Sequence, residues 1–331
     1  MNENIYIILN IYIYMKQNKY KYFLPILIIL LLLLLLVLFL FFHYNQREGF
    51  FDTNYEKTIY LIWRNKIANS GTYHGFGDKL RGSIFLYDYC YKNNINFKID
   101  ATDDISSEFL KNVKSSDYEI IKNKEILNIA DLSVTKTEET IQNELTKNDT
   151  IYIFTNVCTG GWPNVLSEHE KLFAKFICEP KDDIMNDVNN KIKILPENFG
   201  VQHFRFSDNV FANDIDNNNK LFKKYFDLLV ENKKPTDILF TNSNNFKKYV
   251  KDKLDIKTID CDHELCKIAH IGSSTDMESV KNSFIEFFIL SKSKYIKSYN
   301  CYNWASNFVQ WPASIYDIPF ENVYIDESTL V

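Results

Sequence analysis

The chain has 331 residues, of which 46% are hydrophobic and 15% aromatic, and a formal net charge of −5 at pH 7. An acidic chain without a run of five basic residues after its apolar N-terminal segment is not a nucleic-acid scaffold, and we expect no nucleic-acid partner. The hydrophobic content excludes general disorder and suffices for the cores of two domains. Any bound anion must therefore be held by a small number of specifically positioned Lys or Arg side chains.

Residues 23–42, from Phe23 to Phe42, form the most apolar segment, with twenty residues that include no charge and no amide. At about 1.5 Å per residue, a helix of this length spans about 30 Å, the thickness of a bilayer core. The alternative is a cleaved signal peptide, but the run is longer than the apolar centre of such peptides and does not end in small residues. The segment therefore predicts a transmembrane anchor in contact with membrane lipid.

The basic residues around this segment predict its orientation. Three lysines precede it within residues 1–22, and Arg47 is the only basic residue close behind it. Because cytoplasmic flanks carry the excess of lysine and arginine, the N-terminus should face the cytoplasm. We expect a single-pass membrane protein with a juxtamembrane stem at 43–54 and its folded part in a lumen, as in the Golgi or the ER, or outside the cell.

Beyond the stem, short apolar runs rich in β-branched and aromatic residues alternate with segments of helical periodicity. In the first domain, residues 55–196, the sequence predicts strands at 58–63, 95–99 and 150–155, a helix at 78–91, and a helix at 168–177 with Ser167 as its N-cap. In the second domain, residues 197–331, it predicts strands at 199–206, 237–241, 256–259 and 295–299, and helices at 218–232, 245–254, 276–291 and 302–316, the last broken at Pro312. This alternation predicts an α/β fold of two Rossmann-like lobes with parallel sheets and a ligand cleft between them.

The segment Gly75-Phe-Gly-Asp-Lys-Leu-Arg-Gly82 lies between a predicted strand and a predicted helix. Glycines at such a place let the backbone approach a ligand, and the first turn of the helix offers free N–H groups. The spacing is neither that of a dinucleotide-binding G-x-G-x-x-G motif nor that of a P-loop, which argues against a membrane sulfotransferase. A tight structural turn is the alternative interpretation.

The second informative segment, His203-Phe-Arg-Phe-Ser-Asp208, ends the strand that opens the second domain. Strand alternation sends His203, Arg205 and Ser207 to one side and the two phenylalanines to the other. An arginine at the carboxyl edge of a parallel strand points into the cleft, where its planar fork can bind phosphate oxygens and neutralise a diphosphate leaving group. Alternatively, Arg205 pairs with Asp208 on the surface, which contributes at most about 1 kcal/mol.

These two segments resemble the N-terminal glycine motif and the H-x-R-x-G-D motif of the fucosyltransferase superfamily, which includes α1,2-, α1,6- and protein O-fucosyltransferases. The third region of that superfamily, a helix, a short strand and a serine-rich turn, is similar to residues 283–308 of this chain. The polar turn Thr241-Asn-Ser-Asn244 also resembles the superfamily, although such turns are common at strand ends. Together these segments extend the resemblance over residues 60–318.

The resemblance implies a GT-B fold, a nucleotide-sugar donor held mainly by the C-terminal domain, inversion at the anomeric carbon, and no cofactor or metal requirement. It implies that Arg205 holds the β-phosphate of the donor and that His203 supports that arginine or the phosphate. Asp208 would orient the loop or contact the nucleoside. The predicted catalytic pair is therefore Arg205 and His203.

Five further residues complete the donor site that the resemblance implies. Gly75, Gly77 and Arg81 would lie across the cleft and help to close it on the diphosphate or the acceptor. Ser306 would be the C-terminal hydroxyl near the phosphates, and Asp276 would approach the donor base. The function implied is a membrane-anchored inverting glycosyltransferase that transfers fucose from GDP-fucose to a hydroxyl of a glycan or a protein.

Two features depart from the pattern of the superfamily. Ser207 occupies the glycine position of the second motif, which restricts φ there. No sequence pattern marks an acidic residue as the base that takes the proton of the acceptor hydroxyl, and Asp78 and Asp100 are candidates only. The alternative function is therefore a catalytically inactive, membrane-tethered carbohydrate-binding protein on the same fold.

Tryptophans and cysteines leave two further alternatives open. Trp162, Trp304 and Trp311 could stack on a sugar, although tryptophans are more often core anchors. The six cysteines permit disulfides in a lumenal domain, whereas buried free thiols are the simpler interpretation.

Overall fold

The computed structural model describes residues 27–37, 55–64, 75–157, 165–211, 213–259, 267–272, 274–302 and 304–329, and it describes only the backbone of Asp208, Phe211 and Thr329. The chain divides into two compact units, Met1–Thr53 and Asn54–Val331.

In the first unit, residues 27–37 form a helix of leucine, isoleucine and valine whose side chains are exposed. Among the described residues, no helix combines the length and the apolar character that crossing a membrane requires. The predicted anchor at 23–42 includes residues outside the described range and stays a prediction. The predicted segments 1–22 and 43–54 lie outside the described residues.

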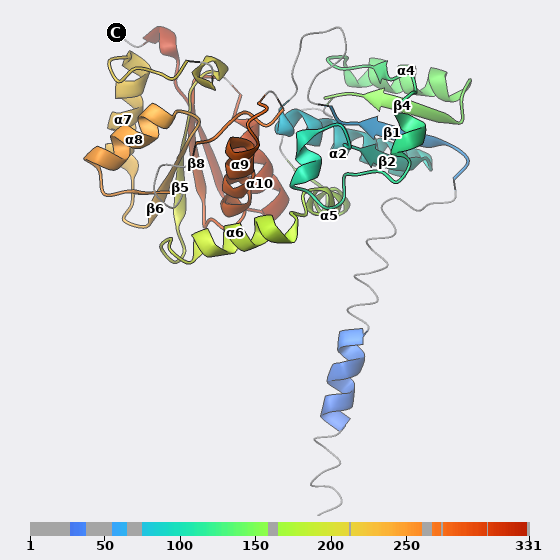
Figure 1. Cartoon of the computed structure of the whole chain (residues 1–331), viewed down its shortest axis with the longest axis horizontal. Coiled ribbons are helices and arrows are strands. Elements are labelled where there is room, and N and C mark those ends of the chain that lie inside the picture. Colours follow the sequence, from blue (N-terminus) through green and yellow to red (C-terminus); the bar gives the residue numbers. More distant parts are fainter. Residues whose placement is uncertain are drawn as a thin grey trace, which may run out of the picture. The chain divides into compact units, whose positions relative to one another are not determined.

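The described part of the second unit contains two parallel sheets (Figure 1). The N-terminal sheet has the order β2-β1-β4-β3, with β1 (Thr58–Ile62), β2 (Asn96–Asp100), β3 (Leu127–Asn128) and β4 (Thr150–Phe154). Its helices are α2 (Phe76–Asn93), α3 (Tyr118–Ile121), α4 (Val134–Leu145) and α5 (Glu168–Ile177), and a short 3-10 helix, η1, spans Ile105–Glu108. β1 is a central strand between β2 and β4, and Ile59–Ile62 are buried, as is typical of the continuous apolar runs of parallel sheets covered by helices.

Local sequence signals set the ends of the two helices that pack on β1 and β2. α2 ends at Asn94, whose left-handed backbone at φ 53° turns the chain into β2. α5 begins after Ser167, as predicted, and the Glu170 carboxylate accepts a hydrogen bond of 2.7 Å from the Ser167 backbone N–H. The two helices pack together through Phe173, which stacks on Tyr87 with ring centroids 4.0 Å apart.

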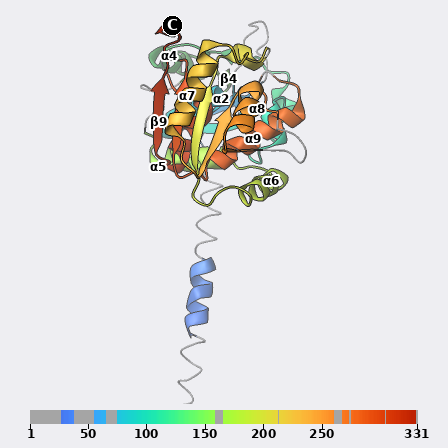
Figure 2. The same ribbon diagram turned by 90° about the vertical axis from the view of Figure 1, so that its left-hand side faces the viewer.

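The C-terminal sheet has the order β7-β6-β5-β8-β9. Its strands are β5 (Gly200–Arg205), β6 (Asp237–Thr241), β7 (Lys257–Thr258), β8 (Ile296–Asn300) and β9 (Phe320–Tyr324). Its helices are α6 (Asp182–Ile192), α7 (Lys220–Asn232), α8 (Asn244–Lys253), α9 (Met277–Leu290) and α10 (Asn307–Tyr316), with 3-10 helices η2 (Asp208–Phe211) and η3 (Glu327–Thr329). α7 and α8 cover one face of the sheet, and α9 and α10 cover the other (Figures 1 and 2).

The core under α7 and α8 is aromatic and centres on β5. Phe204 stacks on Tyr299 of β8 with ring centroids 4.6 Å apart and an interplanar angle of 5°. Phe206, Tyr225 and Phe246 complete this buried cluster. The apolar side of the predicted strand alternation is therefore confirmed, and it fixes which residues of β5 face the opposite side of the sheet.

The predicted alternation of strands and helices is confirmed, and the structure adds elements that the sequence did not predict, among them β3, α3, α4, α6 and β9. β9 is an additional parallel strand at the edge of the C-terminal sheet. α6, counted with the first domain in the sequence, packs along α9, and its Asp187 carboxylate lies 2.7 Å from the Lys281 ammonium. α10 runs through Pro312 to Tyr316 and is not broken there, because the buried side chains of Val309 and Trp311 hold the helix although proline removes one hydrogen bond.

The start of α2 joins the two lobes. Phe76, its first residue, contacts Trp63 edge-on at the end of β1 and makes edge-on contacts with Phe284 and Phe287 of α9. Its backbone N–H also donates to the carbonyl of Ile271 at 3.1 Å. The glycine segment therefore lies where the N-terminal sheet meets the helices of the C-terminal sheet, and the division into domains at 55–196 and 197–331 stays a prediction.

Candidate active site

The end of β5 presents His203 and Arg205 on the face opposite the aromatic core. His203 is 2% exposed, and its Nδ1 lies 2.9 Å from the Oγ of Ser298 on the neighbouring strand β8. The Tyr225 hydroxyl donates to the backbone carbonyl of Arg205 at 2.9 Å and holds the strand end in place. Pairing with β6 on one side and β8 on the other makes this strand end rigid.

The protonation state of His203 follows from its surroundings. Burial, together with the positive charge of Arg205, lowers the pKa of His203 from 6.5 to about 3. The imidazole is therefore neutral at physiological pH and is too weak a base to accept a proton from an alcohol. A neutral ring can still donate or accept a hydrogen bond through Nε2 while Nδ1 is engaged with Ser298.

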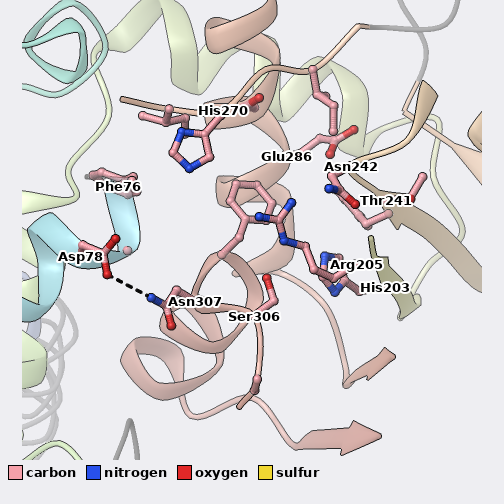
Figure 3. A pocket seen from close by; sticks show the side chains of 18 of the residues that line it. Phe76, Asp78, His203, Arg205, Thr241, Asn242, His270, Glu286, Ser306 and Asn307 are labelled. Carbon is pink, nitrogen blue, oxygen red and sulfur yellow. Dashed lines mark hydrogen bonds between the residues drawn. The ribbon is translucent and has the colours of Figure 1, made fainter. Parts of the chain in front are cut away.

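A cavity of about 520 Å³ opens in front of these two residues. Figure 3 shows the Arg205 side chain extending into it, with Asp78 on the far side and His270 above. The cavity is bounded by the carboxyl ends of β5 and β6, the segment before α9, the start of α10 and the start of α2. Its lining includes Phe76, Asp78, Phe240, Thr241, Asn242, His270, Glu286, Tyr302, Trp304, Asn307 and Phe308, besides the predicted residues.

Six of the predicted site residues line this cavity together. They come from three separate parts of the chain: Gly75, Gly77, Arg81, His203, Arg205 and Ser306. Ser306 is the N-cap of α10, and its hydroxyl makes no capping bond to that helix. The cavity therefore combines the Arg205 guanidinium, the neutral His203 imidazole and the N-terminus of α10. This combination suits the binding of an anion.

Two predicted residues are not placed in the cavity. Asp276 is the N-cap of α9 and accepts a hydrogen bond from the backbone N–H of Ser279 at 3.4 Å. The Ser279 hydroxyl also donates to the Asp276 carboxylate and holds the pKa of Asp276 below its usual range. Asp276 does not line the cavity. The side chain of Asp208 lies outside the described residues, so its predicted role stays a prediction.

The glycines of the first motif serve a contact between protein segments. A Cβ at Gly77 would lie 2.4 Å from the Cβ of Asn307, and the Gly77 carbonyl accepts a hydrogen bond from the Trp311 indole at 2.9 Å. A Cβ at Gly82 would lie 2.1 Å from the carbonyl oxygen of Thr155. Glycine is therefore required where α2 meets α10 and the end of β4. The motif is thus both a tightly packed turn and part of the cavity wall, so both interpretations of it apply.

Polar contacts connect the two sides of the cavity. Asp78 pairs with Arg81 at 3.2 Å and accepts a hydrogen bond of 3.4 Å from the side chain of Asn307. The imidazole Nε2 of His270 and the Oδ2 of Asp78 lie 3.1 and 3.9 Å, respectively, from the place a Cβ at Gly75 would take. Asp100, the other candidate base, is buried, bonds Thr102 and does not line the cavity.

Sequence reasoning missed several polar residues of the cavity. Asn242 accepts from the Phe206 backbone N–H at 2.8 Å and donates to the Phe206 carbonyl at 3.1 Å, so it ties the end of β6 to the end of β5. The sequence indicates Asn242 only through the polar turn at 241–244, which by itself indicates no role for this residue. Glu286 is 2% exposed, and its pKa is raised by burial although the Lys247 ammonium lies 3.0 Å away. Its only signal was a carboxylate within the apolar run at 284–290.

The motif serine and the remaining tryptophans and cysteines are also placed. The described non-glycine residues with positive φ are Asn94, Asp131, Asn198 and Asp317, so Ser207 is accommodated without the backbone strain that its position suggested. Trp311 is 2% exposed, whereas Trp304 is 57% exposed. Trp162 lies outside the described residues, as do Cys158, Cys261 and Cys266, and the described cysteines Cys90, Cys178 and Cys301 are free thiols.

No protein-family model matches the sequence, and no curated protein matches it either. Among solved structures, a NodZ α-1,6-fucosyltransferase soaked with GDP-fucose is similar at a TM-score of 0.51, with 12% identity over 83% of this chain and 97% of that chain. Fucosyltransferase NodZ from Bradyrhizobium in selenomethionine form is similar at a TM-score of 0.50, with 12% identity over 82% of this chain and 96% of that chain. At such identities the likeness establishes the fold. The chain has the mixed α/β fold with parallel sheets of these GT-B-like fucosyltransferase structures, and the resemblance seen in the motifs is confirmed at that level.

Proposed function

We propose that this protein is a glycosyltransferase that transfers fucose from GDP-fucose to a hydroxyl of a glycan or a protein. The observation that carries the proposal is Arg205 in the interlobe cavity beside the neutral, buried His203, on a fold shared with a fucosyltransferase structure soaked with GDP-fucose. The GDP-sugar is a co-substrate, and we expect neither a cofactor nor a metal to be required.

Arg205 would stabilise the departing diphosphate. Cleavage of the bond from the sugar to the β-phosphate leaves negative charge on phosphate oxygens, and a guanidinium can bind two of them at once. The N-terminus of α10, with the Ser306 hydroxyl, would stabilise the same negative charge through its free N–H groups. His203, whose Nδ1 lies 2.9 Å from the Ser298 hydroxyl, would support Arg205 or the phosphate from the neighbouring position and adds no competing positive charge.

The inner part of the cavity suits the nucleoside of the donor. Thr241 and Asn242 are 3% and 6% exposed, and they lie at the carboxyl end of β6, where ligands bind to parallel sheets. The buried Glu286 carboxylate can accept N–H donors of a base or hydroxyls of a ribose. These residues enclose the donor on the C-terminal side of the cavity.

Inversion at the anomeric carbon requires a group that accepts the proton of the acceptor hydroxyl, and we assign this role to His270. His203 is too weak a base because its pKa is about 3. Asp78 is already bound to Arg81 and Asn307. His270 extends into the cavity from the segment before α9, across from Arg205 (Figure 3). A neutral imidazole is the commonest general base of enzymes.

The proposal includes a membrane anchor at residues 23–42, with the N-terminus in the cytoplasm and the second unit on the other side of the membrane. Its support is the apolar composition of that segment and the lysines that precede it. Placing the termini by protease protection of intact microsomes tests this part independently. Digestion of the second unit without detergent would contradict the proposed orientation.

The experiment that tests the reaction uses the full-length chain in detergent with a panel of nucleotide sugars. GDP-fucose should raise the melting temperature more than UDP- or CMP-sugars do, because a ligand that binds only the folded state stabilises it by mass action. GDP release with fucose on an acceptor then establishes turnover. Binding of GDP-fucose without transfer or hydrolysis would favour the inactive carbohydrate-binding alternative, and no response to any GDP-sugar would overturn both.

A further inference from the structure

The exposed Trp304 and the half-buried Tyr302 form an aromatic pair at the cavity. Their rings are stacked, with centroids 5.2 Å apart and an interplanar angle of 15°. Trp304 is 57% exposed, in contrast to Trp63 and Trp311, which are 1% and 2% exposed and serve as core anchors. Both residues of the pair line the cavity that contains Arg205. A large apolar ring held in water at the edge of a polar cavity is an unfavourable arrangement for the free protein and marks a binding surface.

The pair lies beside the donor-binding residues, between the end of β8 and Ser306, and differs from them in its exposure. The residues at the carboxyl ends of β5 and β6 are nearly inaccessible: His203, Thr241 and Asn242 are 2%, 3% and 6% exposed. A diphosphate sugar held by these residues occupies the enclosed part of the cavity. Both substrates enter from solvent, but the donor fills the enclosed part, which leaves the accessible part, where Trp304 lies, for the acceptor.

The shape of the surface favours a sugar over an extended peptide. β5, the strand that ends at the cavity, is paired with β6 on one side and β8 on the other, so it offers no open edge to which a peptide could add as a strand. Stacked aromatic rings offer a rigid, flat surface at a low cost in conformational entropy. The apolar C–H face of a pyranose covers such a ring while its hydroxyls stay in contact with water and polar groups.

We propose that Tyr302 and Trp304 form the acceptor subsite of the cavity, and that the acceptor is a carbohydrate whose ring stacks on Trp304. This assignment rests on the proposed glycosyl transfer and makes it specific, because it selects a glycan hydroxyl over a protein hydroxyl. The Trp304 side chain would bring the acceptor hydroxyl between Arg205, at the leaving group, and His270, at the proton.

Kinetics of the full-length chain test the assignment with Trp304→Ala, Trp304→Phe and the matched control Tyr91→Ala. Tyr91 is an aromatic side chain of α2 that is 63% exposed and does not line the cavity. With GDP-fucose as donor and N-acetyllactosamine or chitotriose as acceptor, Trp304→Ala should raise the KM for the oligosaccharide about ten-fold more than the KM for GDP-fucose. Trp304→Phe should recover most of this loss, and Tyr91→Ala should behave as wild type. A rise confined to the KM for GDP-fucose, or no rise in either, overturns the assignment.

Tryptophan fluorescence separates failure of this subsite from failure of the proposed reaction. Iodide should quench Trp304, since the other described tryptophans are buried. In the presence of GDP, either oligosaccharide should reduce quenching in the wild-type chain and leave quenching of Trp304→Phe unaffected. Such protection supports the subsite even without turnover. If neither oligosaccharide protects Trp304 while GDP still raises the melting temperature, the subsite is wrong and the donor site stands.

Discussion

The two sides of the cavity are built differently. On the C-terminal side, His203, Thr241 and Asn242 are nearly buried and are fixed by paired strands and by hydrogen bonds between strand ends. On the N-terminal side, the side chains of Asp78 and Arg81 are 28% and 29% exposed and come from the first turns of one helix. The C-terminal side is therefore preorganised to hold charge, whereas the N-terminal side closes against it through contacts that require glycine.

This difference predicts where substitutions change chemistry and where they change stability. A charged group on a rigid strand end acts on the transition state, because it needs no rearrangement as charge develops. A helix start packed by glycines against another helix acts mainly on the association of the lobes. Matched substitutions on the two sides of the cavity test this difference.

The largest effect is expected for Arg205→Ala, with Arg81→Ala as the matched loss of a guanidinium from the other side. Arg205→Ala should lower the kcat for fucose transfer about 10²–10³-fold, because it removes a donor to the leaving group. Arg81→Ala should cost about ten-fold or less, since Arg81 is paired with Asp78. Initial rates of GDP release and fucose transfer measure both. Equal losses would show that the two sides do not differ in the way described.

His270→Ala should lower transfer about 10²-fold by removing the proposed proton acceptor. Added imidazole should restore part of the rate, which a purely structural loss would not allow. Asp78→Asn is the control on the N-terminal side and should lose less activity, with no response to imidazole. If imidazole restores activity to neither variant and Asp78→Asn loses more activity than His270→Ala, Asp78 is the proton acceptor instead.

Gly77→Ala should destabilise the second unit by about 1–3 kcal/mol through overpacking. Its Cβ would lie 2.4 Å from the Cβ of Asn307, on the start of a helix that cannot easily move. Gly75→Ala is the control, because its nearest neighbour is the end of the His270 ring at 3.1 Å, which can shift by a few tenths of an ångström. Thermal unfolding of both variants measures the difference. A Gly77→Ala chain as stable as Gly75→Ala would refute the required close approach.

The most gradual effect is a pH dependence of stability at His203. Its folded-state pKa of about 3 lies below the ordinary value of 6.5, so between these pH values the unfolded state binds a proton that the folded state does not. This contribution is complete above pH 6.5 and is lost as the pH falls, at a slope of up to about 1.4 kcal/mol per pH unit. Urea unfolding of wild type and His203→Asn between pH 6.5 and about pH 4.5 should give a shallower slope for the variant. Identical slopes would mean that His203 becomes protonated in the folded chain.

Much of the fold could be predicted from local patterns. The continuous apolar run of β1, the alternation along β5 and the cap at Ser167 each reflect interactions within a few residues. β9 was not predicted, because none of its five residues is buried and the segment forms a strand through pairing with β8. The continuation of α10 through Pro312 also depends on burial against other elements, which overrides the local preference.

The candidate site was predicted to a similar degree. Arg205, His203 and the glycines belong to compact motifs, and the parallel topology brings strand ends to one edge. His270 and Glu286 could not be found in the same way. Neither belongs to a motif, and each enters the cavity because the segment before α9, or α9 itself, packs against the start of α2.

The amino-acid sequence by itself determined the α/β alternation, the apolar segment at 23–42 and the facing of Arg205 away from the aromatic core, because these follow from periodicity and composition along a short stretch of chain. The tertiary structure alone decided that Trp304 is exposed while Trp311 is buried, and that Gly77 contacts Asn307. It also decided that His203 is neutral. Burial and close approach depend on elements distant in the chain, and no local pattern records how closely those elements pack.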